Sequence, residues 1–296
     1  MFILFFYGVK FGRTRNPPKN SDFILKTMFQ DYYYEIGHVS EIPVKLEIDV
    51  VNVSKKIKRD IETSIIGMRE DYHQKIGHIE SNLDINTWKD SSGNYYHTLV
   101  VPLIKPRKSV RIEIYYTIVT RPYQIGQKVD LIIEKQEIEK LMNVYPYQKH
   151  TSNKIKDIAA KLNSNDPMRT IMNVAGWVLK NIAYEKTYRR LSVTDTINRR
   201  RGSCLSISDL IVAILRACSI PVRVIRGLYM DRPHAWVEAY ISRNELTIVP
   251  IDVLGGMVGG LGSIWISRYA ELTPTINEAD AKDSDIRVSC RVIIPQ

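Results

Sequence analysis

Cys204 combines a reactive residue type with a position that favours its reactivity. It opens a stripe of mostly apolar residues at intervals of three and four, which continues through Ile207, Ser208, Ile211, Ile214, Leu215 and Cys218. This spacing predicts a helix whose first turn carries Cys204 on the inward face. Free backbone N–H groups and the positive end of the helix dipole favour a thiolate there, and Arg201 acts in the same direction. The pattern predicts a nucleophilic thiol, whereas Cys218 and Cys290 lack this setting and are expected to be packed cysteines.

His234 and Asp252 place an imidazole and a carboxylate on two predicted strands, residues 234–241 and 245–252. Turn-forming residues at 242–244 favour a hairpin between them. A hairpin centred on the middle turn residue sets His234 opposite Asp252, with Cβ atoms about 5 Å apart on one face. A carboxylate in this position orients the imidazole and stabilises its protonated form. With an activated thiol available, the pair is predicted to be catalytic.

Three further residues are expected at substrate-binding or wall positions. Trp236 shares the face of His234 by strand alternation. Gly202 and Ser203 immediately precede Cys204, and a glycine allows a substrate or another backbone to approach closely.

The elements that must position these residues follow one another from about residue 150 onward. Residues 155–162 carry apolar side chains at helical spacing, and a second helix begins with Asp166 as cap and Pro167 in its first turn. Strands are predicted at 221–229, at the hairpin described above and around 286–294. Helices followed by an antiparallel meander predict an α+β fold.

The first half of the chain reads as strands. Residues 44–50 and 110–118 alternate with period two, and residues 91–94 have turn chemistry. Several short strands between turns predict a β-sandwich of about 100 residues. Residues 55–67 are ambiguous between strand and helix. Since this half contains no catalytic constellation, we interpret it as a scaffold or docking domain.

The expected domains are an N-terminal extension (1–29), the β-sandwich (30–135) and a catalytic domain (136–296). All six phenylalanines of the chain lie in the extension. Its positive charges follow its apolar run, which is the reverse of a secretory signal. We interpret the extension as disordered or as a translation start placed too early, with Met28 as the true start. A short tail that touches a membrane is the alternative.

Composition excludes several classes of protein. The net charge is +10, but no nucleic-acid-binding motif accompanies it, so no nucleic-acid partner is expected. No apolar run reaches the roughly 18 to 20 residues of a membrane-spanning helix. Three scattered cysteines form neither a disulfide framework nor a four-ligand zinc site, which favours a reducing, cytoplasmic location. No metal or organic cofactor is implied, and the oligomeric state is left open.

Two other features have structural interpretations. The glycine-rich segment 255–262 lacks the spacing of a phosphate-binding loop and is expected to be a mobile loop after Asp252, acting as a lid. The run Arg199–Arg201 is expected to be a solvated turn. The alternative is that it attracts acidic substrates.

Residues of about 150–256 resemble the transglutaminase-like superfamily. The resemblance is carried by Arg201-Gly202-Ser203-Cys204 and by the segments 210–217, 220–229 and 234–240. They match the family's G-x-C at a helix start, its L-R-A followed by G-I-P-x-R-x-x-x-G-Y, and its H-A-W-x-E strand. Ser219 replaces the usual glycine, and the tryptophan often found before the family's aspartate is missing before Asp252. The resemblance implies a papain-like core with Cys204 as nucleophile, His234 as base and Asp252 as the residue that orients it.

The expected reaction is acyl transfer from an amide or peptide bond of a protein or peptide substrate. The Cys204 thiolate attacks the carbonyl, His234 protonates the leaving amine, and the thioester passes to water or to an amine. The Cys204 backbone N–H is expected to donate to the oxyanion. Hydrolysis of the protease or amidase kind is favoured, because water always competes and no residue marks an amine site. The alternatives are glutamine transamidation (crosslinking), or a non-catalytic protein-binding module that retains the fold. A peptide:N-glycanase-like enzyme would carry a cysteine-rich zinc module, which this sequence lacks.

Overall fold

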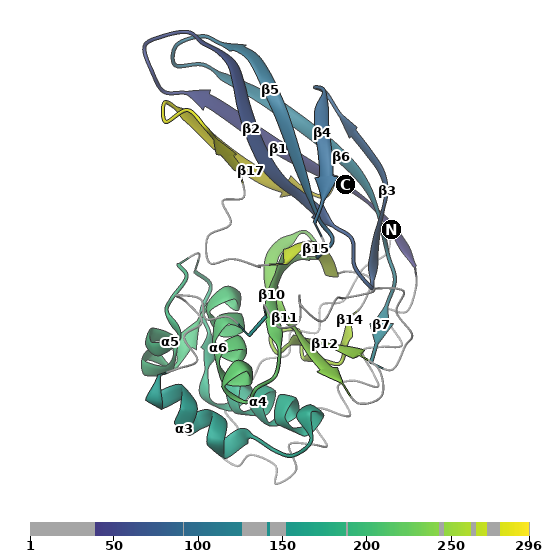
Figure 1. The fold of residues 1–296 in the computed structure, drawn as a ribbon, viewed down its shortest axis with the longest axis vertical. Coiled ribbons are helices and arrows are strands. Elements are labelled where there is room, and N and C mark those ends of the chain that lie inside the picture. The colour runs from purple at the N-terminus through teal and green to yellow at the C-terminus, as the bar shows by residue number, and fades with distance from the viewer. Residues whose placement is uncertain are drawn as a thin grey trace, which may run out of the picture.

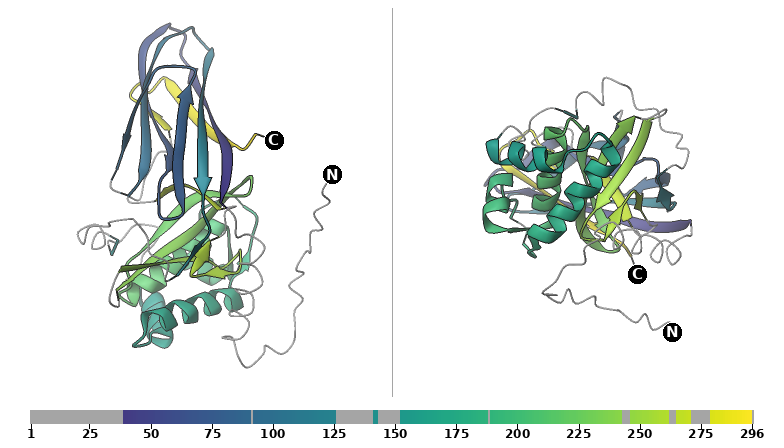
Figure 2. Two further views of the ribbon diagram at one scale, coloured as in Figure 1. Left: turned by 90° about the vertical axis from the view of Figure 1, so that its right-hand side faces the viewer. Right: turned by 90° about the horizontal axis from the view of Figure 1, so that it is seen from below.

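The computed structural model describes residues 39–90, 92–125, 141–142, 152–187, 189–242, 246–261, 265–270 and 279–295. The N-terminal extension expected at residues 1–29 lies outside these ranges. Helices and antiparallel sheets both contribute to the fold, which confirms the α+β prediction. Two units lie end to end, one made of strands and one containing all the described helices (Figure 1, Figure 2).

The first unit, here called the two-sheet unit, consists of two four-stranded antiparallel sheets. One has the order β17-β1-β6-β3, with β1 at Ser40–Asn52, β3 at Gln74–Ser81, β6 at Ser109–Thr120 and β17 at Ile286–Ile293. The other has the order β16-β2-β5-β4, with β2 at Lys58–Arg69, β4 at Ile85–Lys89, β5 at Asn94–Ile104 and β16 at Ala279–Ala281. Alternate apolar residues of both sheets form one hydrophobic core, to which Leu46, Ile48, Ile65, Leu99, Ile112 and Ile114 belong.

The ambiguous residues 55–67 contribute most of β2, and no helix forms there. Ile61, Thr63 and Ile65 are at most 5% exposed. Every second side chain from Ile61 to Ile65 is therefore buried, which is the period of a strand with one face on a core, and the end of β2 at the junction is buried on both faces.

β16 and β17 return to the two-sheet unit. The unit that carries the helices is therefore shorter than the catalytic domain predicted at residues 136–296. β16 pairs with β2, and β17 pairs with β1 along its whole length, with Cys290 opposite Ile48. The sequence predicted a strand around residues 286–294, where β17 lies. A period-two pattern, however, specifies which face is buried and not which strand is the partner. Here the partner is the open edge of β1.

The second unit, here called the helical unit, packs four described helices against a sheet of order β13-β12-β11-β10-β15. The helices are α3 (Asn153–Leu162), α4 (Pro167–Asn181), α5 (Val193–Arg199) and α6 (Cys204–Ala217). The strands are β10 (Val222–Tyr229), β11 (Arg232–Ser242), β12 (Leu246–Asp252), β13 (Met257–Val258) and β15 (Trp265–Ala270). Helix α6 contacts all three other helices as well as β10 and β11. It is apolar on almost every side because it lies at the centre of this unit.

Local signals set the helix boundaries. The Asp166 carboxylate accepts the backbone N–H of Met168 at 3.0 Å, and Pro167 occupies the first turn of α4, as predicted. Helix α5 was not predicted, because seven residues are too few to show a periodic pattern. Its start is nevertheless marked by Ser192, whose hydroxyl accepts the N–H of Asp195 at 3.1 Å. None of the described helices has the length and apolarity needed to cross a membrane.

Backbone pairing and one glutamine join the two units. β7 (Tyr123–Gln124) pairs with β14 (Gly260–Leu261), and β15 contacts β2 as well as pairing with β10. The Gln74 side chain donates to Ser267 O at 2.8 Å and accepts from Ser267 N at 2.9 Å, like an added strand residue. The two units therefore share a polar, hydrogen-bonded junction.

Candidate active site

Cys204 is the first residue of α6 and is partly exposed. Ser203 caps the helix: its hydroxyl accepts the N–H of Ser206 at 3.3 Å and lies 3.1 Å from the Ser206 hydroxyl. An N-cap serine satisfies one of the free N–H groups of the first turn, and the thiol lies beside the others. The local sequence thus fixes the position of Cys204 at the positive end of a buried helix.

Gly202 and Ser203 support this helix start. A Cβ on Gly202 would lie 2.9 Å from Ser206 Cβ and 3.2 Å from Thr196 Cγ2, so the glycine admits close packing of α5 and α6. Ser203 is 5% exposed, and its hydroxyl is engaged in the cap. The structure gives Gly202 a packing role and Ser203 a capping role, because two helices converge at this point. Their expected place in a substrate site stays a prediction.

His234 and Asp252 are hydrogen-bonded, although the predicted register of their hairpin is wrong. Val237 pairs with Ile251, which sets Asp252 across from Trp236 and centres the pairing on residue 244. The ladder is shifted by two residues from the prediction, and a shift of two keeps every side chain on its face. His234 and Asp252 are therefore diagonal neighbours, and His234 Nε2 lies 2.8 Å from Asp252 Oδ2.

The carboxylate of Asp252 is held on both sides. Its Oδ1 accepts the backbone N–H groups of Leu254 at 3.2 Å and Gly255 at 3.1 Å, while its Oδ2 faces His234. The side chain is 2% exposed. A carboxylate fixed in this way holds the imidazole ring in one orientation.

Residues 255–261 of the glycine-rich segment after Asp252 do not form a free lid. β13 pairs with β12, β14 pairs with β7, and both short strands are buried. Gly259 has a φ of 85°, which lets the chain turn tightly between them. Its N–H donates to Pro250 O at 2.7 Å, and its carbonyl accepts from Ile125 N at 2.6 Å. These glycines build part of the junction, and Gly262 lies outside the described part of the chain.

His234 carries a proton at neutral pH. Burial lowers the pKa of His234, but the negative charge and hydrogen bond of Asp252, together with a hydrogen bond to the Cys204 thiol, outweigh burial and raise the pKa to about 10. Since Nε2 faces Asp252, Nδ1 is the ring nitrogen available to the thiol. The thiol, imidazole and carboxylate are thus connected in that order, and the catalytic roles of the three residues stay a prediction.

We expect NMR titration of the His234 ring to show no deprotonation between about pH 6 and pH 9, because the raised pKa lies above this range. Asp252→Asn removes the negative charge that opposes the effect of burial on the His234 pKa. The titration midpoint of His234 should therefore move down into this pH range. His97 in the two-sheet unit, whose pKa burial lowers to about 4, provides the internal comparison and should stay neutral over this range in both proteins. A wild-type midpoint near the usual value for histidine would contradict the ion pair.

Two aromatic rings flank His234. Trp236 is fully buried, with its ring 6.3 Å from the imidazole and tilted by 26°, and the Tyr229 ring lies 5.9 Å away. Gly227 makes room for the indole, since a Cβ there would lie 2.8 Å from Trp236 Cη2. Trp236 therefore lies beside His234, where alternation predicted it, and acts as a packed support for the ring.

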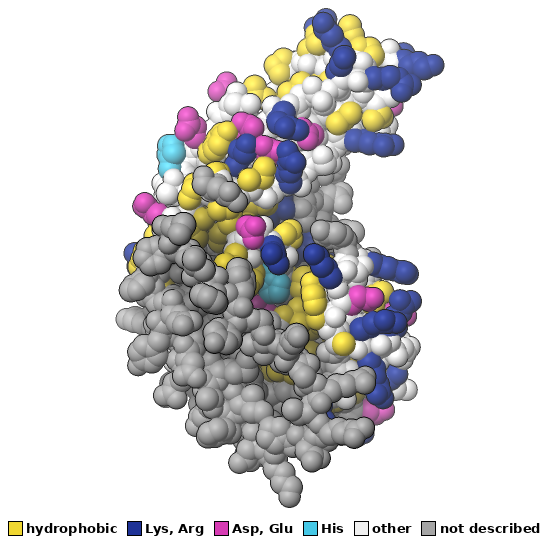
Figure 3. Space-filling model, turned by 180° about the vertical axis from the view of Figure 1, so that it is seen from behind, with side chains coloured by type: hydrophobic (Ala, Val, Ile, Leu, Met, Phe, Trp, Pro, Cys, Tyr) yellow, Lys and Arg dark blue, Asp and Glu magenta, His cyan; other side chains and the backbone are white. Residues whose placement is uncertain are grey.

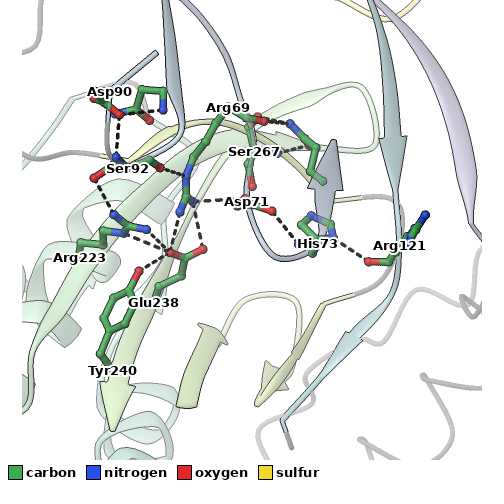
Figure 4. Close-up of polar contacts among 12 residues, drawn as sticks. Arg69, Asp71, His73, Asp90, Ser92, Arg121, Arg223, Glu238, Tyr240 and Ser267 are labelled. Atoms are coloured by element: carbon green, nitrogen blue, oxygen red, sulfur yellow. Dashed lines mark hydrogen bonds and ion pairs between the residues drawn. The ribbon is translucent and has the colours of Figure 1, made fainter. Parts of the chain in front are cut away.

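A buried ion cluster, which sequence reasoning missed, lies farther along the same face of β11. The Glu238 carboxylate pairs with Arg69 through two bonds of 3.1 and 3.2 Å and with Arg223 Nε at 3.1 Å, and it accepts from the Tyr240 hydroxyl at 2.9 Å (Figure 4). Both Arg69 and Glu238 are completely buried. The sequence signals were a glutamate at an inward position of the strand and its place as the last residue of the H-A-W-x-E motif.

The cluster connects the two units. Arg69 ends β2 and also contacts Asp71 at 3.3 Å and Ser92 O at 3.0 Å, whereas Glu238 belongs to the helical unit (Figure 4). Burial raises the pKa of Glu238, but the positive charges of Arg69 and Arg223 outweigh this and lower the pKa to about 2. A desolvated carboxylate that two arginines keep ionised holds the two-sheet unit against the strand that carries His234.

The fold and site define an α+β protein in which a cysteine at the start of a central helix faces a histidine–aspartate pair on an antiparallel sheet. Residues 156–252 match the profile of the transglutaminase-like superfamily, so this part of the chain is similar to that superfamily. The match contains Cys204 and His234 and ends on Asp252.

Two solved structures are similar to the chain at low sequence identity. A candidate cysteine protease from Cytophaga hutchinsonii superposes with a TM-score of 0.53 and 17% identity, over 87% of this chain and 92% of that chain. The periplasmic domain of TgpA from Pseudomonas aeruginosa gives a TM-score of 0.42 and 13% identity, over 75% of this chain and 90% of that chain. The first likeness extends over both units and shows a common fold. No protein with a curated description matches the chain.

Proposed function

We propose that this protein is a cysteine-dependent enzyme that hydrolyses amide or peptide bonds through a thioester on Cys204. The observation that carries the proposal is the hydrogen bond between His234 and a fixed, buried Asp252, with the imidazole also bonded to the thiol at the start of α6. A protonated imidazole beside a thiol at a helix N-terminus is the setting that generates a thiolate nucleophile.

The proposed reaction has two halves, formation of a thioester and its hydrolysis, and each catalytic group acts once in each half. Cys204 Sγ attacks the carbonyl carbon, and the C–N bond breaks as His234 Nδ1 gives its proton to the leaving amine. A water molecule then attacks the thioester, giving a proton back to Nδ1 and releasing a carboxylic acid and the thiolate. Asp252 stays ionised and keeps Nδ1 directed at the reacting atoms. The Cys204 N–H, free in the first turn of α6, supports the oxyanion in both halves.

We further propose that the two-sheet unit is a β-sandwich that serves as a scaffold. The two sheets share one apolar core, and the buried Arg69–Glu238 pair fixes the unit to β11. A unit held by fully desolvated charges is suited to supporting β11 and less suited to swinging as a flexible docking arm.

We expect iodoacetamide to alkylate Cys204 at least about tenfold faster than Cys218 or Cys290 in the folded protein at pH 7, because the imidazolium and the helix start favour its thiolate. Burial raises the pKa of Cys218. Cys290 is the sharper comparison, since Arg268 Nη2 lies 3.3 Å from its sulfur. Rates are read by mass spectrometry of tryptic peptides. Equal rates for the three thiols would refute a catalytic Cys204.

The acyl acceptor is then identified by product analysis. The protein is incubated with a peptide mixture in H₂¹⁸O, with and without a dansylated primary amine, and Cys204→Ala is the control. New carboxyl groups carrying ¹⁸O support hydrolysis, whereas incorporation of the amine alone would replace hydrolysis by transamidation. Identical mixtures from wild type and Cys204→Ala would overturn the proposed acyl transfer.

A further inference from the structure

A set of exposed cations lies in the segment that leads into Cys204. It comprises Lys186, Arg189, Arg199, Arg200 and Arg201, here called the basic rim. Within the described ranges none of these five forms an ion pair, whereas their neighbour Arg190 is neutralised by two 2.8 Å bonds to the buried Asp209 of α6. The rim therefore presents uncompensated positive charge to solvent.

Backbone pairing places the rim next to the thiol. The short parallel strands β8 (Ala183–Tyr184) and β9 (Arg201–Gly202) pair with each other, and Glu185 N donates to Gly202 O at 2.9 Å. Arg201 is three residues before Cys204, and Ala183 N donates to Arg200 O at 2.9 Å. Both segments that carry the rim are thus tied to the residues that start α6. In Figure 3, Lys and Arg side chains predominate at the right, on the side of the molecule where Figure 1 places α5.

Exposed apolar groups accompany the charge. Tyr184 is 55% exposed and pairs through its backbone with Gly202. Met230 is 42% exposed at the turn between β10 and β11, and the neighbouring Tyr229 contacts the His234 ring. A peptide that reaches the thiol and the imidazole thus meets positive charge and apolar surface together.

We propose that the site selects acidic peptide segments, with Glu or Asp side chains near the acyl-donor residue that interact with the basic rim. The inference rests on the proposed function and names its substrate class. A peptide is favoured over nucleic acid because the segments that carry the rim adjoin the start of α6, where the proposed chemistry acts on amides. Exposed ion pairs contribute little each and are screened by salt, so the combined preference should be about tenfold at low ionic strength and should fade at high ionic strength.

The test uses three peptide electrophiles that differ only in two residues flanking a thiol-reactive group: Glu, Gln or Lys. The second-order rate of Cys204 modification is measured by intact mass at about 20 mM and about 500 mM NaCl, where screening lengths differ severalfold. The Glu probe should react about tenfold faster than the Lys probe at low salt, with the Gln probe between them, and the three rates should converge at high salt.

Two triple variants of equal charge change separate the rim from net charge. R199Q/R200N/R201Q removes three cations of the rim, and K105Q/R107N/K108Q removes from the turn between β5 and β6 three exposed cations that pair with no acidic group among the described residues. Arg200 and Arg107 both have a φ of 53°, so asparagine, which tolerates this conformation, replaces both. The control turn follows Ile104, which pairs with Lys58 at the end of β2 opposite to Arg69 and the junction.

The rim variant should lose most of the Glu-over-Lys preference, and the control variant should keep it. Equal rates for the three probes, or equal losses in the two variants, would overturn the inference. So would competition for the rim by a single-stranded oligonucleotide while peptide charge has no effect, which would identify the rim as a nucleic-acid contact. Iodoacetamide, which is small and neutral, is the separate check on the proposed function. Preferential labelling of Cys204 by it, without charge selectivity, rejects only the inference.

Discussion

Asp252→Asn should lower the turnover number of the proposed reaction by about 10² to 10⁴ while leaving the fold intact, with the serine triads as the upper bound. The asparagine oxygen still accepts the N–H groups of Leu254 and Gly255 that hold this turn. What is lost is the negative charge 2.8 Å from His234 Nε2, so the imidazole loses both its orientation and the partner that keeps it protonated. Steady-state kinetics with the best peptide substrate measure the effect, and circular dichroism checks the fold.

His234→Ala should cost more than Asp252→Asn, because it removes the proton donor itself. Since Asp252 acts only through the imidazole, the double variant should be no slower than His234→Ala alone. If the two losses multiplied as independent factors, Asp252 would have to act elsewhere. Cys204→Ala should abolish covalent labelling, and it provides the baseline for the turnover measurements.

Glu238→Gln should destabilise the protein by about 3 to 5 kcal/mol, the usual cost of breaking a buried ion pair. Two guanidinium groups, Arg69 and Arg223, would face a neutral amide in a site without solvent. Urea unfolding measures the loss. The matched control is Asp49→Asn, which removes the carboxylate of an exposed pair with Arg111 and should leave the midpoint nearly unchanged. Similar midpoint shifts in the two variants would show that the cluster does not anchor the units.

The same cluster has a pH signature. The pKa of Glu238 is lower in the folded protein, at about 2, than its ordinary value of 4.5. A depressed folded-state pKa means that the unfolded chain binds a proton first as the pH falls, so this contribution to stability is present above about pH 4.5 and is lost towards pH 2. Glu238→Gln has no such proton to bind, and its stability should fall less steeply over this interval.

The parts of the site that depend on short stretches of sequence could be predicted, since the caps and spacing that define them are local. Ser203 and the stripe after it specify where α6 begins, and alternation puts His234 and Trp236 on one face. The hairpin register could not be predicted in the same way. The composition of the turn allowed more than one residue to be the centre of the hairpin. The observed pairing, centred on residue 244, is selected by the packing of a whole sheet. His234 and Asp252 still meet because the shift is an even number of residues.

Contacts between distant segments could not be predicted. Arg69 and Glu238 are 169 residues apart, and neither has a local pattern that names the other. The sequence of β17 likewise does not indicate which strand it pairs with. The glycines after Asp252 resembled an open loop in composition, but the carbonyl and N–H of Gly259 are paired with Ile125 and Pro250. In each case the missing information concerns a tertiary partner.

The return of β16 and β17 to the first unit has a consequence for how the chain is made. A ribosome delivers β1 and β2 early, but it delivers β16 and β17, which complete their sheets, only after the whole helical unit. Until then β1 and β2 each have an open edge, and unpaired edges invite association with other chains. The helical unit can collapse around α6 during that interval, while the two-sheet unit closes only after residue 293 has emerged from the exit tunnel. Premature termination anywhere in β17 would therefore expose the edge of β1, the strand farthest from it in sequence, and aggregation rather than loss of chemistry would be the first symptom.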